Sequence, residues 1–261
     1  MINFSTVTNY NVGLGDCLSC FNTNRAIWSP SSHLGVLKKY TSLVALDVPH
    51  GMTLSVSSLH EIDFQGEHLF NRVRIVSGLA PLSEPRAILD LIDYHPIENN
   101  IAFSFDVGVN AFNQKVLHPR ARELYPEHRK TVQEFISKNS SKFNFIEVGK
   151  NTFNFLDSFD QTGENLENTI NILRRCKFYF GMHSGLMHLA TAIGLKCLVV
   201  LNFPDVEALN FNDRNDFFST NKYLNWERHW LYPQHRYLHE DVMIGDYAIT
   251  VENFEKIVLD R

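Results

Sequence analysis

The chain has 261 residues, a formal net charge of −5 at pH 7, 44% hydrophobic and 20% charged residues, which is typical of a soluble globular protein. The acidic balance argues against a nucleic-acid partner, because such proteins normally carry a basic excess. No apolar run approaches 18 residues, so we expect no transmembrane segment. The N-terminus has no basic region followed by an apolar stretch, so we expect no secretory signal.

The first hundred residues predict short α/β elements. A strand runs into the glycine-containing turn NVGLGD, and a helix begins near Asp16. The stretch DYHPIENN at 93–100 combines turn formers with a proline and is the best candidate linker. The expected elements, in chain order, are a strand at 2–9, helices near 16 and at 32–40, a strand at 43–48 and a helical region at 69–95 interrupted by Gly78, Pro81 and Pro85.

After the linker, strands and helices alternate regularly. This alternation predicts right-handed βαβ units on a parallel sheet, as in nucleotide-binding Rossmann-type domains. We expect strands at 101–108, 143–149, 177–181 and 197–203, helices at 126–138, 164–175 and 185–194, and a closing helix at 250–260. We therefore divide the chain into an N-terminal domain (1–97), a second α/β domain (98–220) and a tail that packs back across both halves (221–261).

The stretch GMHSGLMHLATAIG at 181–194 places polar residues where a helix begins after an apolar strand. At about 100° per residue, one face is apolar and predicted to be buried: Leu186, Leu189, Ala190 and Ile193. Ser184, His188 and Thr191 fall on the opposite face. A helix start at the carboxyl end of a parallel strand favours an anion. The pattern alone leaves open whether this is a phosphate site or a simple N-cap serine beside a solvent-facing histidine.

Metal binding is a weaker interpretation of the histidines. His183 and His188 are five residues apart, about 140° around a helix, so they do not share a face as the two histidines of a zinc helix do. His235 and His239 have better spacing but lie in an aromatic-rich segment without a clear third ligand. We therefore expect no metal site.

Cys17 and Cys20 form a CxxC, which could be a redox pair or half of a zinc site. No second CxxC exists, and Cys176 and Cys197 stand alone among apolar neighbours. We interpret all four as reduced packing residues.

Two motifs carry a resemblance to a known family. The sequence SGLMHLA at 184–190 resembles the D-[ST]-G-x-x-H-L-x-A signature of the ADP-heptose:lipopolysaccharide heptosyltransferases, a GT-B glycosyltransferase family, with His183 in place of the acidic residue. Members of this family also open with a strand, a glycine-bearing loop and a Gly-Asp pair, and VTNYNVGLGD places Gly15 and Asp16 there. The resemblance is strongest over residues 101–203. It implies an α/β, GT-B-like fold of two Rossmann-type halves facing a cleft, with a reduced N-terminal half. In such a fold residues 1–97 would form the acceptor-side domain and residues 98–220 the nucleotide-sugar-binding domain.

The resemblance also implies roles for individual residues. Asp16 corresponds to the catalytic base of an inverting transfer, and the loop and helix start hold the diphosphate of the donor, mainly through backbone amides. A phosphate-contacting lysine in the loop after the first strand of the second half nominates Lys115, with Arg120 or Arg122 as substitutes. The implied nucleotide-sugar-binding residues are Gly15, Lys115, His183, Ser184, Gly185, Leu186 and His188.

The expected function is an inverting, metal-independent and cofactor-free glycosyltransferase, hexosyl- or heptosyltransferase-like. It would move a sugar from a nucleoside-diphosphate sugar to a glycan or lipid-linked acceptor of a cell-envelope polysaccharide, in the cytoplasm, with or without peripheral attachment to the inner membrane. The reduced N-terminal half and His183 keep a non-catalytic alternative open, and VGKNTFN stands where the family often has an acidic residue. The alternatives are a non-catalytic GT-B-fold protein that binds nucleotide or glycan, and a nucleotide-sugar epimerase. The segment at 225–241 could line the cleft, but we favour ordinary packing.

Overall fold

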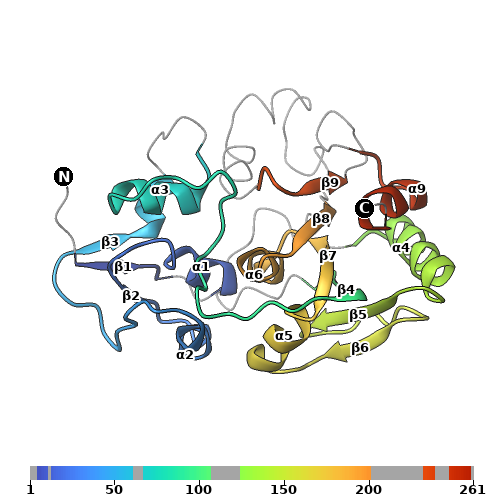
Figure 1. The fold of residues 1–261 in the computed structure, drawn as a ribbon, viewed down its shortest axis with the longest axis horizontal. Helices are drawn as coiled ribbons and strands as arrows, with labels where there is room; N and C mark the ends of the chain where they lie inside the picture. Colours follow the sequence, from blue (N-terminus) through green and yellow to red (C-terminus); the bar gives the residue numbers. More distant parts are fainter. Residues whose placement is uncertain are drawn as a thin grey trace. The chain divides into compact units, whose positions relative to one another are not determined.

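The computed structural model describes residues 5–10, 13–60, 67–106, 124–200, 232–238 and 247–259. By its contacts the chain divides into two compact units, Met1–Ile92 with Asp205–Gln234, and Asp93–Pro204 with His235–Arg261. Each unit contains its own parallel sheet with α-helices beside it (Figure 1). Within the described residues, no helix has both the length and the apolarity needed to cross a membrane.

The first unit is built on a small sheet of three short parallel strands. Its order is β2-β1-β3, with β1 at Thr6–Thr8, β2 at Ala26–Trp28 and β3 at Thr53–Ser55. Val7 of the central strand is fully buried and pairs in register with Ile27 and Leu54. The other elements are α1 (Leu14–Ser19), α2 (His33–Leu37), η1 (Lys38–Tyr40), η2 (Val56–His60) and α3 (Leu69–Val76).

Two predictions for this unit were wrong. The expected strand at 43–48 is reduced to one isolated bridge between Ala45 and Ile27, and its valines Val44 and Val48 are 64% and 69% exposed. Apolar alternation therefore did not mark a buried strand face there. The expected helical region at 69–95 is helical only as far as Val76. The chain turns at Gly78, whose φ is +78°, a left-handed conformation that helices use to end.

The second unit is built on a six-stranded sheet in which every neighbouring pair is parallel. Its order is β6-β5-β4-β7-β8-β9. The strands are β4 (Ile97–Ser104), β5 (Asn144–Gly149), β6 (Phe159–Thr162), β7 (Cys176–Met182), β8 (Lys196–Val200) and β9 (Arg236–Leu238). The helices are α4 (Pro126–Asn139), α5 (Leu166–Leu173), α6 (Gly185–Ile193), α9 (Val251–Phe254) and the π-helical η5 (Glu255–Leu259).

The predicted alternation of this unit is confirmed from β4 to β8. The linker prediction at 93–100 was wrong in its second half, because β4 begins at Ile97 and pairs there with Cys176. Strands β6 and β9 were not predicted. Both are edge strands of three or four residues with largely polar sequences, so neither shows the continuous apolar run of a central parallel strand.

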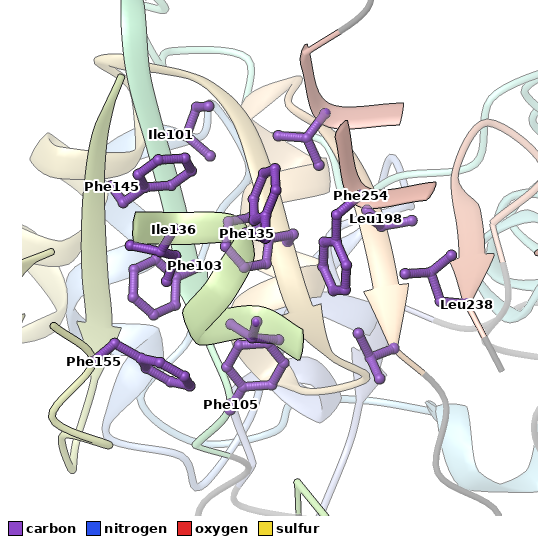
Figure 2. Packing of buried hydrophobic residues seen from close by; sticks show 14 of the residues in the cluster. Ile101, Phe103, Phe105, Phe135, Ile136, Phe145, Phe155, Leu198, Leu238 and Phe254 are labelled. Carbon is purple, nitrogen blue, oxygen red and sulfur yellow. The ribbon is translucent and has the colours of Figure 1, made fainter. Parts of the chain in front are cut away.

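Phenylalanine side chains fill one face of the large sheet (Figure 2). Phe103 of β4 stacks on Phe180 of β7 with ring centroids 5.1 Å apart, and Phe135 of α4 stacks on Phe254 of α9 at 5.2 Å. Since successive residues of a strand point to opposite faces, the residues between these phenylalanines face the other way. That second face, towards α5 and α6, carries the polar residues of the candidate site.

Candidate functional site

The carboxyl ends of the central strands of the second unit meet at one edge. Strands β4, β5 and β7 end at Ser104, Gly149 and Met182. Because all three strands are parallel, these ends lie on the same edge of the sheet, which is where open α/β folds bind ligands.

Two glycines allow the backbone at this edge to come together closely. A Cβ atom at Gly181, whose φ is +157°, would lie 1.9 Å from the carbonyl oxygen of Ser104. A Cβ at Gly149, whose φ is +138°, would lie 3.0 Å from Ser104 Oγ and 3.3 Å from Asp106 Cβ. Glycine is therefore required at Gly181 by direct contact with a neighbouring backbone, and the edge is built tightly around Ser104.

Asp106 holds the chain that leaves β5. Its Oδ2 accepts hydrogen bonds from the backbone N–H groups of Lys150 and Asn151, at 2.8 and 2.7 Å, and from Asn151 Nδ2 at 3.2 Å. Its own N–H donates to Ser104 Oγ at 3.3 Å. Neither Ser104 nor Asp106 was predicted from the sequence, although polar residues at the end of a buried apolar strand are a usable signal.

Helix α6 begins at this edge with its first N–H groups unused by the helix. Ser184 is the N-cap in an extended conformation (φ −153°, ψ 172°), and its side chain makes no capping hydrogen bond. The first backbone bond of the helix joins His188 N to Ser184 O at 3.3 Å. The N–H groups of Gly185, Leu186 and Met187 therefore have no acceptor within α6; such unused N–H groups at a helix start are the groups that commonly bind anions.

His183 and His188 lie together at the start of α6. Their ring centroids are 5.1 Å apart in an edge-to-face arrangement. The helical-wheel prediction that separated them was wrong because His183 precedes the helix, so the 100° rotation per residue does not apply to it. His188 is only 4% exposed, so it is a buried side chain and not a solvent-facing one.

The polar face predicted along α6 is also buried further on. Thr191 is 2% exposed, donates to Met187 O at 2.8 Å, and lies 2.7 Å from Nε2 of the buried His235. Nδ1 of His235 accepts the N–H of Cys197 at 3.3 Å. Nδ1 must then be unprotonated and Nε2 must donate to Thr191, which assigns a neutral tautomer.

The hydrogen bonds of His235 leave this histidine no free ring nitrogen for a metal ion. Both ring nitrogens of His235 are committed to hydrogen bonds, and His239 lies outside the described residues. Across the described part of the chain, no group of three or more His, Cys, Asp and Glu residues is arranged to hold a metal ion.

Asp16 lies in the first turn of α1, directly after β1 in the first unit, and Gly15 precedes it in the same helix. Asn9, fully buried at the end of β1, donates from Nδ2 to Asp16 O at 3.1 Å and to Ser19 Oγ at 3.1 Å. A Cβ atom at Gly13 would lie 2.7 Å from Asp16 Oδ2. The backbone of Asp16 is thus fixed by Asn9, and its carboxylate lies against Gly13, the N-cap residue of α1, which has no side chain.

The two cysteines after Asp16 are packing residues. Cys17 and Cys20 are buried and not disulfide-bonded. Burial raises the pKa of Cys17 to about 12 and the pKa of Cys20 well above its usual range, and the nearby Asp16 carboxylate raises both further. Both thiols therefore stay protonated, which is unsuited to redox or metal chemistry.

Some predicted positions lie outside the described residues: Lys115, Arg120 and Arg122, together with most of 225–241. Tyr232 is described, and it is buried against His68 and Phe70 of the first unit, with ring centroids 4.4 and 6.0 Å away. This contact supports the packing interpretation for that part of the segment.

Comparison with known proteins gives a result only at the level of structure. No family model matches the sequence, and no curated protein matches it either. Among solved structures, E. coli ADP-heptose lps heptosyltransferase II matches with a TM-score of 0.57 at 12% identity over 97% of each chain. E. coli heptosyltransferase WaaC with ADP matches with a TM-score of 0.56 at 11% identity, over 87% of this chain and 100% of that one.

A third match is TibC from enterotoxigenic E. coli, described as an iron-containing dodecameric glycosyltransferase. Its TM-score is 0.54 at 17% identity, over 77% of this chain, and the match spans only 59% of the TibC chain. Two α/β units with parallel sheets, matched to these structures over most of the chain, confirm the fold class predicted from the sequence. This chain has the GT-B-type α/β fold of the heptosyltransferases, with a three-stranded sheet in its N-terminal unit.

Proposed function

We propose that this chain is an inverting, metal-independent glycosyltransferase that moves a sugar from a nucleoside-diphosphate sugar to a hydroxyl acceptor on a glycan or lipid-linked molecule. The observation that carries the proposal is the start of α6. Three backbone N–H groups without helical acceptors lie at the edge where the strands β4, β5 and β7 end. WaaC and TibC share this fold, and their solved structures include complexes with ADP and ADP-D-beta-D-heptose.

The start of α6 suits a diphosphate leaving group. Negative charge builds on the diphosphate as the sugar departs, and N–H donors already fixed in place stabilise that charge without reorganising. The helix dipole adds a favourable contribution of about 0.3–1 kcal/mol for each exposed charge at the N-terminus. Gly185 supports this role because a residue without a side chain lets phosphate oxygens approach the backbone. Lys115, or Arg120 or Arg122, would supply the remaining positive charge.

Asp16 is the proposed general base. In an inverting transfer the acceptor hydroxyl attacks the sugar on the face opposite the diphosphate, and a base must take its proton. Asp16 lies in the first turn of α1, which follows β1 and a glycine turn. Its carboxylate therefore belongs to the edge of the first unit's sheet where β1 ends. Asp16→Asn retains size and shape but cannot take a proton, so transfer should fall about a hundredfold or more with donor affinity unchanged.

Metal independence needs a test of its own, because TibC, which shares this fold, is described as iron-containing. In this chain the proposed charge compensation comes from N–H groups and basic side chains. We expect transfer to persist in the presence of a chelator and not to respond to added Fe²⁺ or Mg²⁺. Loss of transfer on chelation, restored by one of these ions, would refute this part of the proposal.

The experiment that tests the site begins with thermal-shift and calorimetric titration against ADP, UDP, GDP and CMP, followed by transfer and hydrolysis assays with the sugar derivatives of any nucleotide that binds. Gly185→Asp places a carboxylate against the N–H groups and should abolish binding while leaving the fold intact. Ser141→Asp is the matched control, since it adds the same charge at an exposed position before β5, at the amino edge of the same sheet. Equal affinity in both variants would place the nucleotide elsewhere.

The same series separates the alternatives. The small three-stranded sheet of the first unit would suit a non-catalytic protein that binds nucleotide or glycan. For such a protein we expect binding that Gly185→Asp abolishes, and no turnover with any sugar nucleotide. An epimerase predicts that the sugar nucleotide is converted to its epimer without any acceptor, and that neither the wild type nor Asp16→Asn transfers a sugar.

A further inference from the structure

Tyr179 is a buried phenol that the proposed mechanism does not use. It lies in the middle of β7 and is 0% exposed. Its neighbours along the strand, Phe178 and Phe180, belong to the phenylalanine core, so Tyr179 points to the opposite face, where α5 and α6 pack. A buried tyrosine hydroxyl normally has a hydrogen-bond partner.

The Tyr179 hydroxyl instead ends beside two other hydroxyls at the ligand edge. Its register partner on β4 is Ala102, so Ser104, two residues further along, lies on the same face. Burial raises the pKa of Tyr179, and the hydroxyls of Ser184 and Ser104 are its polar neighbours that lower it. Among the described residues, neither the Tyr179 hydroxyl nor the buried Ser184 Oγ has a partner with good hydrogen-bond geometry.

Ser184 does not use its hydroxyl as serines at this position usually do. Serine is among the most favoured N-cap residues because its Oγ accepts the N–H of the second or third helical residue, here Leu186 or Met187. In α6 that hydrogen bond is not made. The Ser184 hydroxyl is buried beside Tyr179, and the N–H groups that it could have capped stay available.

We propose that Tyr179 is a positioning residue that keeps the Ser184 hydroxyl away from its own helix, so that the first N–H groups of α6 are free to bind the diphosphate of a nucleotide. The inference rests on the proposed nucleotide site. Ser184 Oγ and a phosphate oxygen compete as acceptors for the same N–H groups of α6. The Tyr179 hydroxyl favours the phosphate because it keeps Ser184 Oγ away from these groups. When a ligand is bound, both hydroxyls gain hydrogen-bond partners: Tyr179 donates to Ser184, and Ser184 donates to the ligand.

Tyr179→Phe tests this competition in two ways. Without ligand, Ser184 should rotate and cap α6, so hydrogen exchange at the Leu186 or Met187 amide should slow by about fivefold, the scale of one N-cap bond. With ADP or inorganic pyrophosphate as the probe, affinity should weaken by a similar factor. The free energy of unfolding should stay the same or rise, because an unpaired buried hydroxyl has been removed.

A matched control and a rescue make the test specific. Tyr94→Phe removes a hydroxyl that donates to Cys176 O at 3.1 Å, at the other end of β7, and should change neither the exchange rate nor the affinity. In the double variant Tyr179→Phe with Ser184→Ala the competing oxygen is gone, so amide exchange should return to the wild-type rate. Failure of that rescue would mean that Tyr179 acts on general packing and not through Ser184.

The outcomes separate this inference from the proposed function. Unchanged amide exchange in Tyr179→Phe overturns the positioning role, whatever the protein binds. Slowed exchange in a protein that binds none of the nucleoside diphosphates or pyrophosphate overturns the proposed function, and with it the ligand half of the inference, while establishing the contact between Tyr179 and Ser184.

Discussion

Gly13→Ala should displace the proposed catalytic base without disturbing the fold. The added Cβ would lie 2.7 Å from Asp16 Oδ2, well inside van der Waals contact, and the atom that must yield is the end of a flexible side chain. Gly13 has φ −66° and ψ 153°, which alanine adopts freely. The carboxylate must therefore move by several tenths of an ångström while its backbone stays fixed by Asn9. Misplacement of a reacting group by about 1 Å can cost about a hundredfold, so we expect kcat to fall about ten- to a hundredfold.

The stability of Gly13→Ala should change little. Replacing glycine stabilises a protein by about 0.4–1 kcal/mol through the unfolded chain, but alanine is a poorer N-cap than glycine, and the two effects oppose each other. The assay is steady-state transfer beside urea unfolding. Gly35→Ala, in α2 of the same unit and with nothing within 4 Å of its added Cβ, is the control that should keep full activity. Unchanged kcat in Gly13→Ala would show that the position of the Asp16 carboxylate does not matter, and the base would have to be sought elsewhere.

Three further predictions concern the second unit. Gly181→Ala forces a Cβ to 1.9 Å from Ser104 O, so β4 and β7 must separate, and unfolding in urea should show a loss of about 3 kcal/mol or more; a loss below 1 kcal/mol would contradict the close approach. His235→Ala leaves Cys197 N–H without its acceptor and Thr191 without its donor, so stability should fall by about 2 kcal/mol or more, and a thermal melt unchanged from wild type would refute the network. Burial, opposed by hydrogen bonds from Phe153 N–H and Thr152, raises the pKa of Glu147. The native state therefore holds this proton more tightly than the unfolded chain, and the resulting stability is lost as pH rises from about 4.3 through the raised native value. Glu147→Gln should gain stability relative to wild type across that window, as urea unfolding at a series of pH values would show; a constant difference would argue against the raised pKa.

Much of the second unit could be predicted from the sequence because its elements are long and buried on one or both faces. Apolar runs such as those of β7 and β8 and the amphipathic spacing of α6 fix both the type and the order of elements. The first unit was harder because its strands have three residues each. Apolar periodicity over so few positions says little, and the alternation at 43–48 turned out to be exposed. Tertiary pairing, not local pattern, decides which of these short segments form the sheet.

Within the candidate site, the serine and glycine at the start of α6 stand out in the sequence because a helix begins there directly after an apolar strand. Gly15 and Asp16 were nominated by the resemblance to the heptosyltransferases, because a Gly-Asp pair is common in ordinary turns and helix caps. Ser104, Asp106 and Tyr179 were missed because their importance comes from register. Ala102 of β4 lies opposite Tyr179 of β7, and no local pattern states which strands will be neighbours. Burial of His188 and Thr191 was missed for the same reason, since Thr191 packs against His235, which follows in the chain only after a long interval.

The two ends of the proposed reaction differ in what can be changed without loss of the fold. At α6 the donors are backbone N–H groups, so a side-chain deletion cannot remove them, and only an added group such as the carboxylate of Gly185→Asp, or a competing hydroxyl from Ser184, can occupy them. At α1 the reacting group is one side chain, so it can be neutralised by Asp16→Asn or moved by Gly13→Ala. A loss of binding from changes at α6, combined with a loss of turnover but not binding from changes at α1, is therefore the pattern that a transferase requires. A binding protein would show the first effect alone.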